Sequence, residues 1–301
     1  DTKREGFVPA HGGATLVLLG SRGGESWLQP ETFADNVYVL PGLDPEAASE
    51  LADLILIRHN AGQYRGDQAL GQLLKLLDGY PLALEVVLPN LARQKPDEVL
   101  AALVSGGPGI DPGEIDLTQP DIQQKTRSIL HCIGYSHSNL SPDAQTLLLC
   151  LAPFTGVIHL GGLDSYTEQL KRQPMLAQLP FDRWGEVLQE AVNWGLLTPH
   201  ETEGFVRVQP TLPYFLRTRL NKQPELASSV ERAFCQHYIQ LGAELEHLIQ
   251  SRQANEKRLG LAFAHLEYEN LHQAMMLGLQ VQTSFYYPFS AAYEYLLARQ
   301  D

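Results

Sequence analysis

The sequence predicts a mainly α-helical protein with a short α/β edge near its start and one β-hairpin in its middle. Apolar residues recur at helical spacing through residues 225–301. The run Thr15–Leu19 is continuously apolar, as in a strand buried on both faces of a parallel sheet. In residues 184–220, a helical pattern, two short β-type runs around a polar turn and another helical pattern follow one another.

The composition is that of a globular protein large enough for two or three domains. Of its 301 residues, 44% are hydrophobic and 19% are charged. The net charge of −13 disfavours nucleic acid as a partner, because an acidic chain gains nothing from counterion release. No run of 18 apolar residues occurs, so we expect no membrane partner. Three scattered cysteines (Cys132, Cys150, Cys235) favour a reducing cytoplasm over a disulfide framework or a metal cluster.

The α/β edge is expected in the first forty residues. Thr15–Leu19 and Asn36–Leu40 are the two predicted strands, and turn residues follow each of them. Ser21 and Arg22 come just after the first strand. Ligands bind at the carboxyl ends of strands in open α/β sheets, and guanidinium groups match phosphate oxygens. Taken alone, this arginine also fits a surface loop.

Short helices are expected in the next eighty residues. Asp44 is a typical cap of the first helix, and proline follows it at the first helical position. Further helices are expected over Gln68–Leu77 and Asp97–Val104. Ser105–Pro120 is rich in glycine and proline and predicts a linker or a domain boundary.

A Gly-Tyr-Pro corner joins two of these helices. Gly79 suits the left-handed position just past a helix end, and Pro81 suits the first turn of the next helix. An isolated corner of this kind is usually no more than a connection between helices. Inside the second helix, Pro89 predicts a kink or a break, which costs about 3 kcal/mol if nothing compensates for it.

Residues 121–222 have the pattern of a winged helix. The expected elements are helices from Gln123 and from Ser141, a strand at 157–160, helices at 163–172 and 184–194, a hairpin of 196–198 and 205–208, and a helix opened by Pro210. A winged helix that reads DNA needs a basic stripe on its recognition helix. Residues 184–194 contain no lysine or arginine, and residues 121–220 have a net charge of −1. We therefore interpret this winged helix as a domain that packs against other parts of the protein and does not bind DNA.

The last 79 residues are expected to be helical throughout, in segments near 225–250, 256–280 and 285–299. They contain two Glu-x-x-His pairs, Glu244 with His247 and Glu269 with His272. Such pairs occur in di-iron bundles, which also need one inward glutamate from each of two further helices. Because these helices are rich in polar residues, we favour a solvated face over a metal site.

The strand ending in Ser-Arg, the Gly-x-Pro-Leu-Ala corner and the winged-helix pattern, in this order, resemble the nucleotide-switch module of STAND-class NTPases of the NB-ARC type. The resemblance covers most of the chain. It implies that ADP or ATP is the cofactor. It also implies that Ser21 and Arg22 lie at the phosphates and that Gly79, Pro81 and Leu82 lie against the adenine.

Two features depart from that family. No Gly-x-x-x-x-Gly-Lys-Ser/Thr motif and no strand ending in paired acids occurs, so we expect a fragment whose phosphate loop and magnesium ligands belong to a missing upstream segment. Gln209-Pro210 stands where the family has His-Pro, whose histidine contacts the β-phosphate of ADP and locks the off state. Gln209 can donate a hydrogen bond but carries no charge. The alternative is an ordinary helix start after the hairpin.

By this resemblance the chain is the regulatory portion of a bacterial, cytoplasmic signalling ATPase that acts as an ADP/ATP-dependent conformational switch. The implied domains are the edge of the nucleotide-binding domain (1–42), a helical domain (43–120), the winged helix (121–222) and a tetratricopeptide-like region (223–301).

The last of these domains is implied by Leu266–Ala274, which resembles the first helices of the family's superhelix. That superhelix is expected to continue past Asp301 and to take a protein partner or ligand. Oligomerisation of the full-length protein is a further expectation. The alternatives are a winged-helix transcription regulator and a nucleotide-free helical scaffold for protein interactions.

We expect that this chain alone does not hydrolyse ATP, because it lacks a phosphate loop and the acids that hold magnesium. Phosphate release would be measured across the fractions of a gel-filtration peak. Turnover that persists through further purification and follows the protein would contradict the interpretation as a fragment.

Overall fold

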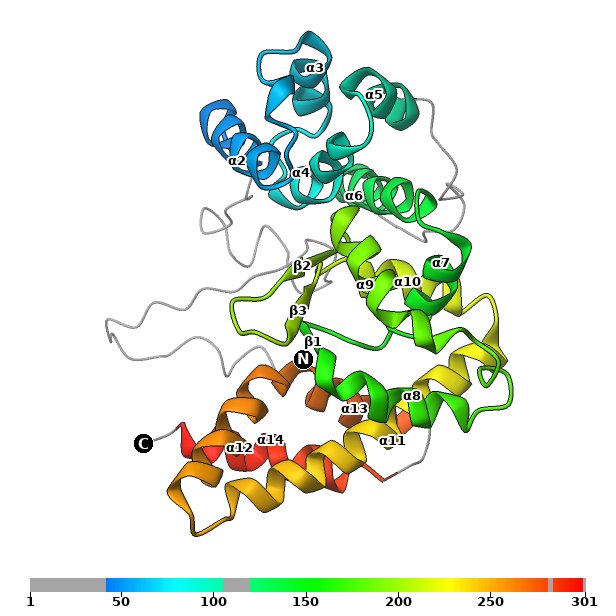
Figure 1. Cartoon of the computed structure of the whole chain (residues 1–301), viewed down its shortest axis with the longest axis vertical. Helices are drawn as coiled ribbons and strands as arrows, with labels where there is room; N and C mark the ends of the chain where they lie inside the picture. Colours follow the sequence, from blue (N-terminus) through cyan, green and yellow to red (C-terminus); the bar gives the residue numbers. More distant parts are fainter. Residues whose placement is uncertain (1–41, 105–119, 281–283, 300–301) are drawn as a thin grey trace. The chain divides into compact units, whose positions relative to one another are not determined.

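The computed structural model describes residues 42–104, 120–280 and 284–299, with only the backbone described in 120–128. The chain divides into two compact units, and the second unit, Pro41–Asp116 with Thr126–Asp301, holds the described elements apart from the first residues of α6. These elements are mainly helices, together with one small sheet (Figure 1). The mainly α prediction is therefore confirmed.

Two of the sequence predictions cannot be followed in the structure. The expected strands before residue 42 and most of the expected linker lie outside the described residues. Within the described ranges, no helix combines the length and the apolar character that crossing a membrane requires.

Four short helices and two 3-10 turns form the first group of elements. Their bounds are α2 Pro45–Arg58, η2 Gly62–Tyr64, α3 Gln68–Leu76, α4 Pro81–Val87, η3 Leu88–Ala92 and α5 Pro96–Val104. Carboxylates begin two of these helices, as N-caps should. Asp44 Oδ1 accepts a hydrogen bond from the Ala47 N–H at 2.8 Å, and Asp67 Oδ1 accepts one from Ala69 at 2.7 Å.

The break expected at Pro89 lies between α4 and η3. Proline has no N–H, so it leaves a carbonyl in the preceding turn without its usual donor. That carbonyl belongs to Glu85, four residues before the proline. The side chain of Asn90 satisfies the next two carbonyl groups, because its Nδ2 donates to the oxygens of Val86 at 2.9 Å and Val87 at 2.8 Å. Because Asn90 is completely buried, these side-chain bonds replace helix bonds where water cannot reach.

The middle of the chain folds as helices around an antiparallel sheet of strand order β1-β3-β2. The elements are α6 Pro120–Ser138, α7 Pro142–Leu149, β1 Val157–His159, η4 Leu160–Gly162, α8 Leu163–Lys171, η5 Phe181–Arg183, α9 Trp184–Asn193, β2 Leu197–Pro199, β3 Phe205–Val208 and α10 Leu212–Leu220.

The expectation that Pro210 opens the helix after the hairpin is wrong, because α10 begins at Leu212. The Leu212 N–H donates to the Gln209 carbonyl at 2.9 Å, so the intervening residues form a turn. Pro213 takes the place in the first turn of α10 that suits proline.

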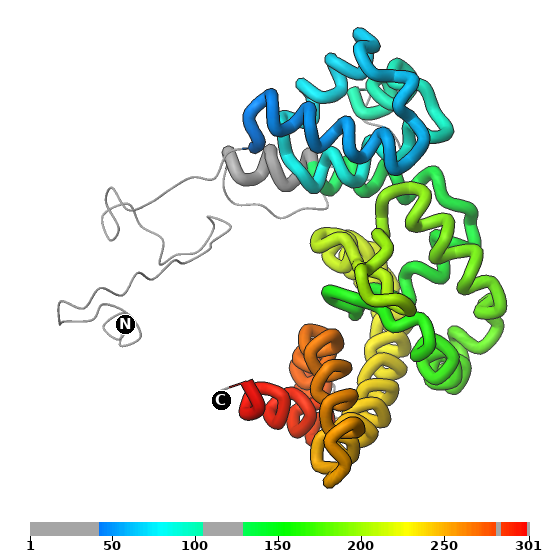
Figure 2. The backbone as a smooth tube through the Cα atoms, turned by 60° about the vertical axis from the view of Figure 1, so that its left-hand side comes forward, coloured from blue at the N-terminus to red at the C-terminus, as the bar shows by residue number. Residues whose placement is uncertain are grey.

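Four helices follow, namely α11 Pro224–Ile249, α12 Ala254–Leu266, α13 Tyr268–Gln280 and α14 Tyr286–Ala298. The long helix α11 packs against the other three (Figure 2). One helix was expected over 256–280, whereas the structure has two that are separated at Glu267. Glu267 ends α12, and its buried side chain turns towards α11 rather than to solvent.

A buried polar network attaches these helices to the sheet. Asn270 Oδ1 accepts from the Thr155 N–H at 2.7 Å, and Asn270 Nδ2 donates to the Val157 carbonyl at 2.8 Å. Glu267 Oε2 accepts from Asn270 Nδ2 and from the Tyr238 hydroxyl, each at 2.8 Å. The side-chain amide of Asn270 thus pairs with the 155–157 turn as a peptide group would, and Glu267 orients it.

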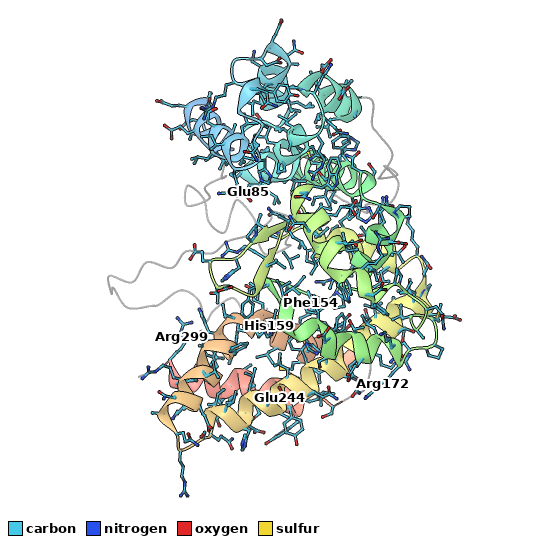
Figure 3. All side chains as sticks on the ribbon, in the orientation of Figure 1. Glu85, Phe154, His159, Arg172, Glu244 and Arg299 are labelled. Carbon is cyan, nitrogen blue, oxygen red and sulfur yellow. The ribbon has the colours of Figure 1, made fainter. Side chains whose placement is uncertain are left out.

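An aromatic cluster lies beside this network. Phe154, which is labelled in Figure 3, belongs to this cluster. It makes edge-to-face contacts with Tyr166, Phe234 and Tyr238, at centroid distances between 5.0 and 6.1 Å. These four side chains are at most 3% exposed. They come from the middle segment and from α11, so the attachment buries substantial apolar area as well as polar groups.

Replacing Glu267 with glutamine should make the fold more stable relative to the wild type as pH rises. Burial raises the pKa of the Glu267 carboxyl, so the folded state binds its proton more tightly than the unfolded state does. The resulting stabilisation is complete below the unfolded-state pKa and is lost as pH rises through the raised folded-state pKa. Glutamine has no charge to bury and can accept the same hydrogen bonds.

The advantage of E267Q over the wild type should grow by about 1.4 kcal/mol per pH unit across that window. Urea unfolding from pH 4 to pH 8 measures it, with the exposed Glu244→Gln on α11 as the matched control. If the free energies of unfolding of E267Q and wild type differed by the same amount at every pH, the protonation of Glu267 would not be coupled to folding.

Candidate functional site

Gly79 occupies the position that only glycine tolerates at the corner before α4. Its φ is +64°, in the left-handed region. Its carbonyl accepts from the Leu43 N–H at 2.8 Å, and a Cβ on Gly79 would lie 2.3 Å from the Leu43 carbonyl oxygen. The corner is therefore held against the segment that leads into α2.

Pro81 begins α4, as expected, and α4 has two different faces. Ala83, Leu84 and Val87 face the core and are at most 3% exposed. Pro81 is exposed and Glu85 is half-buried. Residues four apart share one face of a helix, so Glu85 lies one turn from Pro81 along the same edge.

Gln209 lies against this helix. Its Nε2 donates to Glu85 Oε2 at 3.2 Å, although the two residues are 124 positions apart. Gln209 follows β3 directly and is only 4% exposed. Its backbone N–H donates to the Leu196 carbonyl at 3.4 Å. The residue after the hairpin and the helix opened by Pro81 therefore meet.

Gly195 brings the backbones of the same two segments close together. Its φ is +71°, and it lies in the turn between α9 and β2. A Cβ there would lie 2.7 Å from the Glu85 carbonyl oxygen and 2.9 Å from both the Val86 carbonyl oxygen and Pro89 Cγ. The turn therefore rests directly on the carboxyl end of α4.

Further contacts surround this end of α4. The Arg93 guanidinium lies over the Trp194 ring, 5.4 Å from its centroid, and its Nη1 donates to the Asn193 carbonyl at 3.4 Å. From α6, the Ser136 hydroxyl donates to the Val86 carbonyl at 3.0 Å. We call this set of contacts, from Glu85 to Arg93, the α4 junction.

Two buried polar side chains lie near the junction in sequence but lack partners among the described residues. The Thr211 hydroxyl is buried, two positions after Gln209. Neither ring nitrogen of His137 on α6 has a partner, and the ring packs edge-to-face on Phe215 at 5.2 Å. Burial, and then the charge of Arg219, lower the pKa of His137 to about 3, so this histidine is neutral at physiological pH.

The predicted site is therefore described only in part. Ser21 and Arg22 lie outside the described residues. Gln209 contacts Glu85 of α4, the helix that Pro81 begins. Leu82 is half-buried and is next to Pro81. Their role in nucleotide binding stays a prediction.

Sequence reasoning missed Glu85 and Gly195. One signal for the first was available, because Glu85 is the one acidic residue of α4 and lies one turn after Pro81.

The Glu-x-x-His pairs show no metal centre. In the part of the chain that the structure describes, no group of three or more His, Cys, Asp or Glu residues is placed to hold a metal ion. The three cysteines are buried, and burial raises the thiol pKa to about 12 for Cys132 and Cys150 and to about 11 for Cys235. Such thiols are poor nucleophiles at neutral pH.

Comparison with protein-family models, with curated proteins and with solved structures finds no match to this chain. The residues of the α4 junction and the order of the elements around it therefore remain as the indications of function.

Replacing Gly195 with alanine should destabilise the junction more than the same change at Gly204. Both glycines have positive φ, +71° and +83°, so alanine meets a similar backbone cost of roughly 1–2 kcal/mol at each. Only at Gly195 does the new Cβ overlap backbone atoms, which adds about 1–3 kcal/mol. Urea unfolding of both variants measures the difference, and equal losses would show that the turn does not rest on α4 in solution.

Proposed function

We propose that this chain is the regulatory part of a STAND-class, NB-ARC-like signalling ATPase, in which bound ADP or ATP sets the arrangement of the arms. The observation that carries the proposal is the hydrogen bond between Gln209 and Glu85. It joins the residue where the family has its ADP-contacting histidine to the helix whose first residue, Pro81, is expected at the adenine. A switch needs such a contact between the arms.

The order of the elements supports a winged helix in the middle segment. Helix α7, strand β1, helices α8 and α9 and the β2–β3 hairpin follow one another, and β1 pairs with β3 at the edge opposite β2. In this arrangement the hairpin is the wing, and Gln209 is the first residue after it. The family's His-Pro pair has the same place, directly after the wing.

The nucleotide would lie beside Pro81 and Leu82, with Ser21 and Arg22 at its phosphates and Gln209 closing from the winged helix. The phosphate loop and the magnesium ligands would come from sequence outside these 301 residues. The unpaired Thr211 hydroxyl supports a polar ligand near this end of the hairpin, because a buried hydroxyl without a partner is costly.

The rival function, transcription regulation by a DNA-binding winged helix, finds no support on α9. The exposed positions of that helix include Glu186 and Gln189, and the helix has no lysine or arginine. Arg183, just before it, is ion-paired with Asp143 and Glu186. A surface of this charge repels phosphate backbones.

The other rival is a helical scaffold that binds protein partners without nucleotide. Helices α11–α14 are compatible with both hypotheses. In a scaffold they would bind partners, and in a switch they would be the partner-sensing region. Apolar and aromatic side chains on α14 are exposed, among them Tyr286, Phe289 and Tyr293. Nucleotide binding by the full-length protein separates the two hypotheses.

Replacing Gln209 with alanine should weaken ADP binding by the full-length protein about threefold to tenfold, because it removes one hydrogen bond from an uncharged donor, worth roughly 0.5–1.5 kcal/mol. Replacing it with histidine, the family's residue, should tighten ADP binding. Isothermal titration with ADP measures both variants, with the exposed Gln189→Ala on α9 as the control. If neither Gln209 variant changes the affinity, Gln209 is only the start of a turn.

A further inference from the structure

We propose that Glu85 competes with the nucleotide phosphate for the side-chain amide of Gln209 and thereby sets the affinity of the site. This inference rests on the proposed function and adds to it a residue that determines nucleotide affinity. In the structure the Glu85 carboxylate accepts from the amide. When nucleotide enters, the phosphate has to displace that carboxylate.

The chemistry of the two acceptors is the same. A carboxylate and a phosphate both offer anionic oxygens that accept from N–H donors and cannot donate. Gln209 Nε2 donates to Glu85 Oε2 at 3.2 Å, and at 4% exposure the Gln209 side chain is almost sealed from water. The amide nitrogen carries two N–H groups, but two anions bound to the same nitrogen would lie close together and repel each other, so one anion at a time is favoured.

The surroundings allow the exchange. Glu85 is only half-buried, so its carboxylate can turn to solvent, whereas Gln209 is held by backbone hydrogen bonds with Leu196 and Leu212. The α4 junction also keeps contacts that need no carboxylate. Gly195 packs on the end of α4, and Arg93 stacks on Trp194. Losing the Glu85 bond therefore leaves the two segments together.

The charge of Glu85 opposes the incoming phosphate even after the carboxylate turns away. No described ion pair neutralises Glu85, because the described pairs join Arg65 with Asp53 and Arg183 with Asp143 and Glu186. Glutamine at position 85 keeps an acceptor for Gln209 and removes the charge. It therefore separates the electrostatic effect from the hydrogen bond.

The first test measures ADP affinity of the full-length protein by isothermal titration, with Glu85→Gln against Asp53→Asn. Asp53 lies on α2 in the same group of helices, so D53N removes one negative charge elsewhere on that group. E85Q should bind ADP about tenfold more tightly than wild type, and D53N should stay within about twofold. Equal effects of the two variants would overturn the proposal, since only the overall charge would then matter.

The second test needs no nucleotide and uses the 301-residue chain. The side-chain amide signal of Gln209 is followed by nitrogen-15 NMR and assigned by its loss in Gln209→Ala. Glu85→Ala should shift this signal upfield, because the charge-assisted acceptor is gone, while Asp53→Asn should leave it in place. An unchanged signal in E85A would show that the pair does not form in solution.

Failure of the proposed function would look different. If the full-length protein binds no ADP, the nucleotide switch is wrong and the competition falls with it, although E85A can still shift the amide signal. If ADP binds normally and E85Q matches D53N, the switch stands and the role of Glu85 is wrong.

Discussion

The carboxyl end of α4 is the point on which the junction depends. Pro89 stops the helix, which leaves carbonyl groups that need partners in a place closed to water. Asn90 supplies two of the hydrogen bonds and Ser136 supplies another, and the Gly195 turn fits against the same end because it has no side chain. Interrupting the helix therefore creates a docking surface for segments that are distant in sequence.

The attachment of the C-terminal helices depends on different interactions. There the contact is a buried amide, Asn270, that pairs with the backbone of the 155–157 turn, beside a packed aromatic cluster. The polar part needs Glu267 to orient it, and burial raises the pKa of that carboxyl. The α4 junction, by comparison, has a half-exposed carboxylate and a stacked arginine at its rim. The two attachments therefore differ in how much of their polar chemistry is open to solvent.

The sequence predicted the features whose causes are local. Asp44 and Ser141 cap helices as expected, Pro89 breaks one, and Gly79 takes the left-handed conformation, because each effect acts within about four residues. The split of α12 from α13 at Glu267 could not be predicted, since periodicity continues through it and the buried partner of Glu267, Tyr238, lies on the separate helix α11. The pairing of Gln209 with Glu85 could not be predicted either, because the two residues are far apart in sequence and local patterns carry no information about such contacts.

The position of Gly156 has a mechanical consequence. Asn270 forms hydrogen bonds with the turn that includes Gly156. The Gly156 carbonyl accepts from the Val208 N–H at 2.8 Å, and Val208 is the residue before Gln209. One hydrogen bond and one peptide bond therefore separate the anchor of the C-terminal helices from the residue that touches α4. A displacement of α13 would therefore pass to the backbone of Gln209 through a hydrogen-bonded turn and one strand residue.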